Sequence, residues 1–204
     1  MDRFVAFSDA VFAFGITLLA LDIRLPLTTH YPTDAALGGA LLSLVPQYAA
    51  FVLSFIVVGA FWMNHHRKFR VITRYDGTLV RIDLLMLMMI VTVPAVTSLL
   101  GEYPYRTAVS LYAATMGTIA ALSLLLTRHA LRHGLIERRL TPLESRQFLL
   151  QPALVAGVFL ISIVVAHWNA QAAMWIWLTL VPASVTLRAR AKSRDAATKT
   201  AAEL

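Results

Sequence analysis

Cysteine is absent from the 204 residues of this chain, and charged residues are scarce, at 14%. Without cysteine the chain cannot form disulfides, thiolate nucleophiles or cysteine-ligated metal sites. A soluble domain has about 25% charged residues, so this composition is typical of a membrane protein. The share of hydrophobic residues, 58%, and a mean hydropathy of +0.69 indicate the same class.

Several motifs with known chemistry are also missing. The sequence has no TVGYG potassium filter, no glycine-rich phosphate loop, and neither HExxH nor GxSxG. We therefore expect no enzyme activity, no cofactor and no metal site. The net charge of +7 could suggest nucleic acid, but the placement of the basic residues gives a membrane reason for it, and we expect no nucleic-acid partner.

Six apolar segments, each near the ~20 residues that cross a bilayer, predict an all-α membrane protein. They cover residues 4–24, 35–64, 79–100, 107–127, 148–167 and 172–187. The second segment is unusually long, and Pro46 is expected to kink it. We expect one six-span domain over residues 1–187, followed by a polar cytoplasmic tail over 188–204.

The basic residues are divided unequally between the two sides of these segments. Of the 18 Lys and Arg residues, only Arg24 and Arg106 fall on the side opposite the N-terminus, which leaves 16 on the N-terminal side. Positively charged loops remain in the cytoplasm, so both termini are expected there. The same asymmetry supports an even number of spans, and the expected location is the plasma membrane.

The first segment is apolar but contains Ser8, Asp9 and Thr17. An aspartate at the centre of the bilayer costs about 2.5–3.5 kcal/mol on insertion scales, so Asp9 should face protein, water or a partner charge. The same segment carries an apolar seam, spaced alternately by four and three residues, that consists of Phe7, Val11, Phe14, Leu18, Leu21 and Leu25. This pattern fits the lining of a symmetric pore, and it equally fits ordinary packing against another helix.

Two adjacent histidines, His65 and His66, end the second segment. Adjacent side chains on a helix point in different directions, so the pair is poorly placed to share a metal. We expect a structural hydrogen bond from one of them, with Asp9, Ser8 or Asp83 as the partner. A pH-sensing or proton-relay role is the alternative, since imidazole titrates near neutral pH.

The first segment also carries a specific motif. Arg3-x-x-x-Phe7-Ser8-Asp9, followed by Thr17 and by Leu-Asp-Ile at 21–23, resembles the R-x-x-x-F-S-D signature of the lysosomal potassium channel family called transmembrane protein 175. The six segments and the end of the second one, Trp62-x-x-His65-His66, support the resemblance. The animal channel has two six-span repeats, and this single set resembles the bacterial form.

The resemblance implies a homotetramer in which four copies of the first helix line a central cation pathway. Selectivity in such channels is attributed to hydrophobic rings, which by distance from Asp9 would fall at Phe14, Leu18 and Leu21. Thr17 would be a polar neighbour of this constriction. The family pattern has isoleucine or leucine at the first ring, whereas this chain has the larger Phe14, whose aromatic face can favour cations.

The signature residues would hold the pore helix in place rather than touch ions. In this interpretation the structural motif consists of Arg3, Phe7, Ser8, Asp9, His65 and Asp83.

The expected function is a potassium-preferring cation channel that closes at an apolar constriction instead of a carbonyl filter. Its partners would be potassium and other monovalent cations, the lipid bilayer and further copies of the chain. The first alternative is a proton-coupled secondary transporter that uses Asp9 and His65/His66. The second is a membrane-embedded scaffold or enzyme with Asp9, His65 and Asp83 as its polar machinery.

Overall fold

The computed structural model describes residues 2–21, 23–25, 30–136 and 141–178, without the side chains of Asp2, Pro142 and Leu143. These residues form seven helices: α1 (Asp2–Leu18), α2 (Asp34–Ser43), α3 (Val45–Phe69), α4 (Gly77–Glu102), α5 (Arg106–Arg132), α6 (Pro142–Ala166) and α7 (Ala170–Leu178). Within these ranges the extended pairing is limited to one bridge, between Ile72 and Ile136. The all-α prediction is confirmed.

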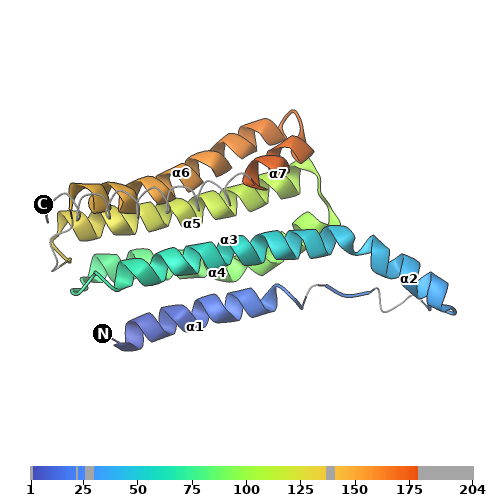
Figure 1. Ribbon diagram of the computed structural model, residues 1–204, viewed down its shortest axis with the longest axis horizontal. Coiled ribbons are helices and arrows are strands. Elements are labelled where there is room, and N and C mark those ends of the chain that lie inside the picture. The colour runs from blue at the N-terminus through green and yellow to red at the C-terminus, as the bar shows by residue number, and fades with distance from the viewer. Residues whose placement is uncertain (1, 22, 26–29, 137–140, 179–204) are drawn as a thin grey trace, which may run out of the picture.

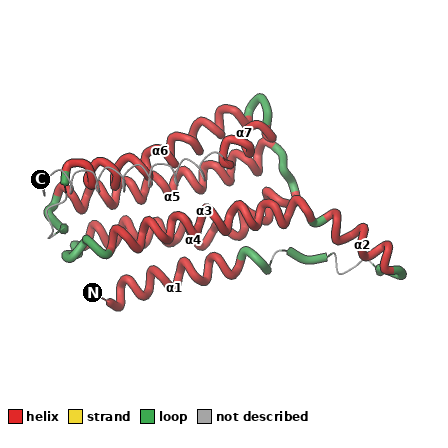
Figure 2. The backbone as a smooth tube through the Cα atoms, in the orientation of Figure 1, coloured by secondary structure: helices red, strands yellow, loops and turns green. Residues whose placement is uncertain are grey.

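The long helices α3 to α6 run side by side in an up-and-down arrangement (Figure 1). Helix α5 packs mainly against α4 and α6, while α1 lies along α4 and α3 at one side of the bundle. The short α7 folds back against α6 and α5. Helix α2 extends away from the end of the bundle (Figure 2). None of the residues of α2 is buried within the chain.

Four of the described helices, α3 to α6, are long and apolar enough to cross a membrane. Helix α1 has 17 residues and so measures about 25 Å, slightly less than the ~30 Å hydrocarbon core. In the first predicted segment, 4–24, the α-helix ends at Leu18. Beyond it the backbone forms the tighter bonds Ala20 N to Thr17 O and Leu21 N to Leu18 O, and then leaves the helix.

The second predicted segment, 35–64, is two helices rather than one kinked helix. The break lies at Leu44, between the end of α2 and the start of α3. Pro46 lies in the first turn of α3, where the N–H that it lacks has no helical partner to lose. Thr33 accepts a bond from the N–H of Ala36 through its side chain and caps α2.

The third, fourth and fifth predicted segments correspond to α4, α5 and α6, and each helix extends beyond its apolar run. Helix α5 continues to Arg132, and α6 begins within the polar stretch that precedes residue 148, at a capping box formed by Thr141 and Glu144. For the sixth segment, 172–187, the structure describes α7, and residues 179–187 lie outside the described part. The predicted tail, 188–204, lies outside it as well.

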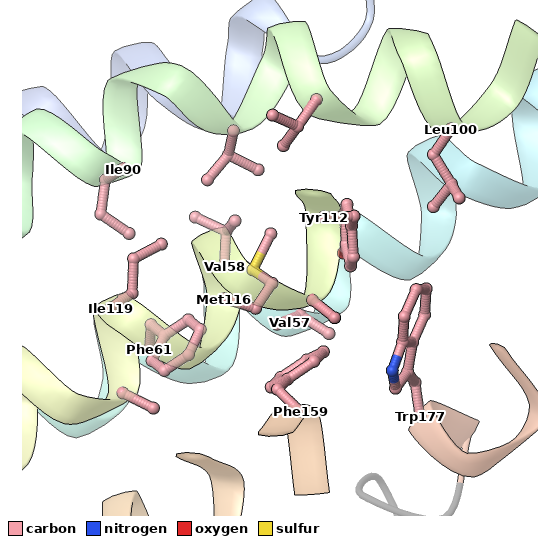
Figure 3. Close-up of a cluster of buried hydrophobic side chains, with 14 of the residues drawn as sticks. Val57, Val58, Phe61, Ile90, Leu100, Tyr112, Met116, Ile119, Phe159 and Trp177 are labelled. Atoms are coloured by element: carbon pink, nitrogen blue, oxygen red, sulfur yellow. The ribbon is translucent and has the colours of Figure 1, made fainter. Parts of the chain in front are cut away.

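The core lies between α3, α4, α5 and α6 (Figure 3). Large side chains fill it, among them Tyr112, Phe159 and Trp177, whose rings lie 4.9–6.4 Å apart between centroids. Polar atoms inside it are bonded: Thr97 donates to Ser54 at 2.8 Å, and Ser54 bonds the Tyr112 hydroxyl at 3.0 Å. These bonds connect α3, α4 and α5 within an otherwise apolar layer.

The basic residues gather at one end of the bundle. The C-terminal ends of α3 and α5 and the N-terminal ends of α4 and α6 lie at the end where α1 begins (Figure 1). These helix ends carry Arg67, Lys68, Arg81, Arg128, Arg132 and Arg146. Arg106 begins α5 at the opposite end. The fold therefore places these six basic residues at one end of the bundle and Arg106 at the other, as the sequence predicts.

Candidate functional site: the first helix and its polar anchor

One face of α1 is fixed against the rest of the chain. Ser8, Phe12, Gly15 and Leu19 are all buried, and their spacing of four, three and four residues places them on one side of the helix. Helices α4 and α3 cover this side. We call these four residues the anchor face of α1.

The apolar seam lies on a different side of α1 and is largely uncovered. Phe7, Phe14 and Leu21 are 51%, 60% and 66% exposed, while Val11, Leu18 and Leu25 are half-buried. Leu21 and Leu25 follow the end of the helix, so the seam continues into the turn beyond α1. Of the three predicted constriction residues, Phe14 and Leu21 are therefore exposed within the chain, whereas Leu18 is half-buried.

Thr17 is exposed beside the seam, and its hydroxyl bonds its own helix. The Oγ1 atom donates to the carbonyl oxygen of Phe14 at 2.8 Å. The hydroxyl proton is thereby used by the backbone, and the oxygen keeps lone pairs that a cation can meet.

The anchor face begins at a buried polar cluster centred on Asp83. Its Oδ2 accepts from the hydroxyl of Ser8 at 2.9 Å, and its Oδ1 bonds Nε2 of His65 at 2.8 Å. All three residues are buried. One carboxylate of α4 thus joins α1 to α3. Of the three partners that the sequence predicts for the histidine pair, Asp83 is the one that bonds His65.

The surroundings of His65 are aromatic on both sides. Its ring lies 4.4 Å from Phe69 and 5.3 Å from Phe12 between centroids, and its buried Nδ1 has no hydrogen-bond partner. This arrangement fits a fixed structural histidine.

Asp9 makes a separate contact at the rim of this cluster. Its Oδ1 accepts from the indole N–H of Trp62 at 2.9 Å, and the Trp62 ring lies 5.7 Å from that of His66. Asp9 therefore pairs with a neighbouring helix, but with Trp62 rather than with either histidine. Of the other motif residues, Arg3 and Phe7 have exposed side chains.

A buried lysine was not singled out by the sequence. Lys68, one turn after His65 on α3, donates to the carbonyl oxygen of Ser123 at 2.8 Å and to its hydroxyl at 2.7 Å. In the described part of the chain no carboxylate pairs with it. In the sequence Lys68 stands in a basic run at a helix end, where a solvated charge is the ordinary expectation, so no local signal distinguishes it.

A further contact holds the loop between α3 and α4. Asp76 caps α4 by accepting from the N–H of Leu79 at 2.7 Å, and its other oxygen bonds Nε2 of His129 on α5 at 2.7 Å. These two contacts, the backbone bond first, hold the pKa of the Asp76 carboxyl below its usual range. Tyr75, the preceding residue, packs against Phe4 of α1 with 5.4 Å between ring centroids.

Two acid–imidazole pairs join helices: Asp83 with His65, and Asp76 with His129. Over the described ranges, no group of three or more His, Asp or Glu residues is placed to hold a metal ion. What the arrangement offers is an apolar helix face held at a fixed position by buried polar bonds.

Comparison with known proteins identifies this arrangement. Residues 3–94, from α1 into α4, match the family model described as the endosomal/lysosomal potassium channel TMEM175. The crystal structure of a lysosomal potassium-selective channel TMEM175 homolog from Chamaesiphon minutus has a TM-score of 0.77 and 32% identity, over 92% of this chain and 96% of that one. The chain belongs to the TMEM175 family.

Other TMEM175 relatives are matched over shorter stretches. A potassium channel of Streptomyces collinus is 40% identical over 129 residues, which are 63% of this chain and 61% of that protein. A potassium channel of Chamaesiphon minutus is 42% identical over 132 residues, 63% of this chain and 64% of that protein. The alignments thus span less than two thirds of either relative. TMEM175 is a family of channels and not of enzymes, and the chain is a multi-pass membrane protein.

Proposed function

We propose that this TMEM175 protein is a potassium-preferring cation channel in which α1 of four copies surrounds a hydrophobic constriction. The proposal includes six spans per subunit, both termini in the cytoplasm and a place in the plasma membrane. Relatives that are named potassium channels support the ion. Phe14, Leu18 and Leu21 would form the constriction, with Thr17 beside it.

The observation that carries the proposal is the exposure of the seam on a helix whose other side is anchored. A helix that served only to pack within its subunit would bury its largest side chains, whereas Phe14 and Leu21 are 60% and 66% exposed. Exposed apolar side chains could also face lipid. The buried bonds of Ser8 favour a lining role, because they fix the rotation of α1 and so the direction of the seam.

An apolar ring can control ion flow without any charged group. Water leaves a narrow hydrophobic constriction readily, and ions cannot pass without water or replacement ligands. Widening the ring restores the path. Four Phe14 rings would be a bulky first constriction, and their electron-rich faces would favour cations over anions.

The contacts also bear on the alternative of a proton-coupled transporter. That mechanism needs Asp9, His65 and His66 to exchange protons, but Asp9 bonds Trp62 and His65 bonds Asp83. A carrier of this kind would show saturable uptake driven by a pH gradient and abolished by Asp9→Asn.

The proposal is tested by Phe14→Ala and Leu18→Ala in proteoliposomes. Each substitution shortens a side chain of the proposed ring, so potassium flux should rise severalfold and the preference over sodium should fall. Leu160→Ala is the matched control, because Leu160 is 60% exposed on α6, away from the seam. If flux and selectivity are the same in all four proteins, the assignment of the constriction is wrong.

A further inference from the structure

Helix α1 approaches α4 closely at Gly15, the residue next to Phe14. A Cβ atom added at Gly15 would lie 3.3 Å from Cγ2 of Ile90 and 3.6 Å from the carbonyl oxygen of Ile90. The first distance is shorter than about nine in ten contacts that real Cβ atoms make. An alanine at position 15 therefore requires either the Ile90 side chain or one of the two helices to shift by a few tenths of an ångström.

The carbonyl oxygen of Ile90 lacks the hydrogen bond that other carbonyls inside α4 accept. Pro94, four residues later, lies inside the helix and has no backbone N–H, so it cannot supply the bond that an α-helix normally makes to that carbonyl. The same carbonyl faces Gly15 across the helix crossing. Cα–H···O contacts recur where two helices pass this closely, and a glycine is what permits them. At this point of the crossing Gly15 of α1 thus lies against Ile90, whose carbonyl lacks the usual helical partner at Pro94.

Ile90 is poorly placed to move away. It is fully buried, and Figure 3 shows its side chain directed into the core towards Ile119 of α5. Packed interiors resist added volume, because neighbouring side chains already fill the space. The seam side of α1 is exposed within the subunit. A methyl group added at Gly15 should thus displace α1 rather than Ile90.

We propose that Gly15 and Ile90 are positioning residues for ion conduction, and that their contact sets how far Phe14 and Leu18 stand from their own subunit. The inference rests on the proposed function, in which the bundle of each subunit lies outside a ring of four α1 helices. A displacement of α1 away from its bundle then has an inward component and narrows the path. A displacement towards the bundle widens it.

Single-channel recording with potassium on one side and sodium on the other tests this with three variants. Gly15→Ala adds the methyl group and should lower conductance severalfold. Ile90→Leu keeps the volume but removes the Cγ2 branch that faces Gly15, so it should leave conductance equal or raise it. Gly15→Ala combined with Ile90→Leu should return conductance and the reversal potential towards the wild-type values.

The matched control is Gly59→Ala on α3, where an added Cβ meets nothing within 4 Å and conductance should stay unchanged. A loss in Gly15→Ala that Ile90→Leu does not reverse would overturn the inference, as would wild-type conductance in all three variants. If Gly15→Ala fails to assemble, reassembly and conduction of the double variant still support the inference, and failure of both overturns it.

Phe14→Ala in the same recordings separates the two proposals. If it changes conductance while the Gly15 and Ile90 variants do not, the positioning role is wrong and the constriction stands. If Phe14→Ala and Leu18→Ala also leave conductance unchanged, the proposed function is wrong and the positioning role falls with it.

Discussion

Asp83 joins three helices although it belongs to only one of them. It lies on α4, accepts from Ser8 of α1 and bonds His65 of α3, and its side chain is fully buried. Buried polar groups are costly when their partners are removed, because no water replaces the lost bond. The position of α1 therefore depends strongly on a single carboxylate.

Asp83→Ala should destabilise the protein much more than Ser8→Ala. The first leaves the buried Nε2 of His65 without a partner and removes one bond of Ser8, whose hydroxyl keeps the carbonyl oxygen of Phe4 at 3.2 Å. It should lower the free energy of unfolding by about 2–4 kcal/mol, whereas the second leaves Asp83 bonded to His65 and should cost about 1 kcal/mol. Denaturant unfolding in detergent micelles measures both. Equal losses in the two variants would mean that Asp83 does not carry the cluster.

Single residues differ in how well the sequence reveals them. A buried aspartate in an apolar run demands a partner, so Asp83 could be named as a candidate for the histidine pair. Trp62 enters the sequence analysis only as part of the motif that ends the second segment, and its bond to Asp9 depends on how two helices cross. Gly15 and Lys68 carry no local signal, because their roles depend on Ile90 and Ser123, which are distant in the sequence.

At the scale of helices, the apolar runs predict where the helices lie better than they predict the first and last residue of each helix. Ends are set by caps and by where backbone bonds stop, so α4 begins at its cap Asp76, and α1 stops at Leu18 within a run that continues. Pro46 marked the right region for a break, but as the start of a new helix and not as a kink. These details follow from hydrogen bonds that composition does not report.

The cap of α4 makes stability depend on acid pH. Because its bonds to Leu79 and His129 lower the pKa of Asp76, the folded protein favours the ionised carboxylate. That contribution is present above the unfolded pKa of about 3.9 and is lost as the pH falls through the lower folded pKa. Asp76→Asn keeps a capping side chain but cannot ionise.

We therefore expect the melting temperature of Asp76→Asn to lie below that of the wild type at pH 7, with the difference shrinking below about pH 4. Thermal melts of both proteins in detergent between pH 7 and pH 3 measure this. A difference that stays constant over the whole range would contradict the assigned role of the carboxylate.

For the whole molecule, the fold keeps the asymmetry of the basic residues that the sequence shows. The helix ends that carry most of the described Arg and Lys residues meet at the end where α1 begins (Figure 1). The fold class could be predicted because membrane helices follow directly from long apolar runs. Assembly could not, since a seam that faces outwards within one subunit fits a pore, a lipid surface or a partner helix.

The central claim is that the seam of α1 lines a path for ions between copies of the chain. Because the chain has no cysteine, Leu21→Cys places a single thiol in the part of the seam that follows α1. We predict that a cationic methanethiosulfonate reagent will reduce potassium flux severalfold in proteoliposomes of this variant and leave Leu160→Cys unaffected. Unchanged flux after complete labelling of Leu21→Cys, established by mass spectrometry, would contradict the account.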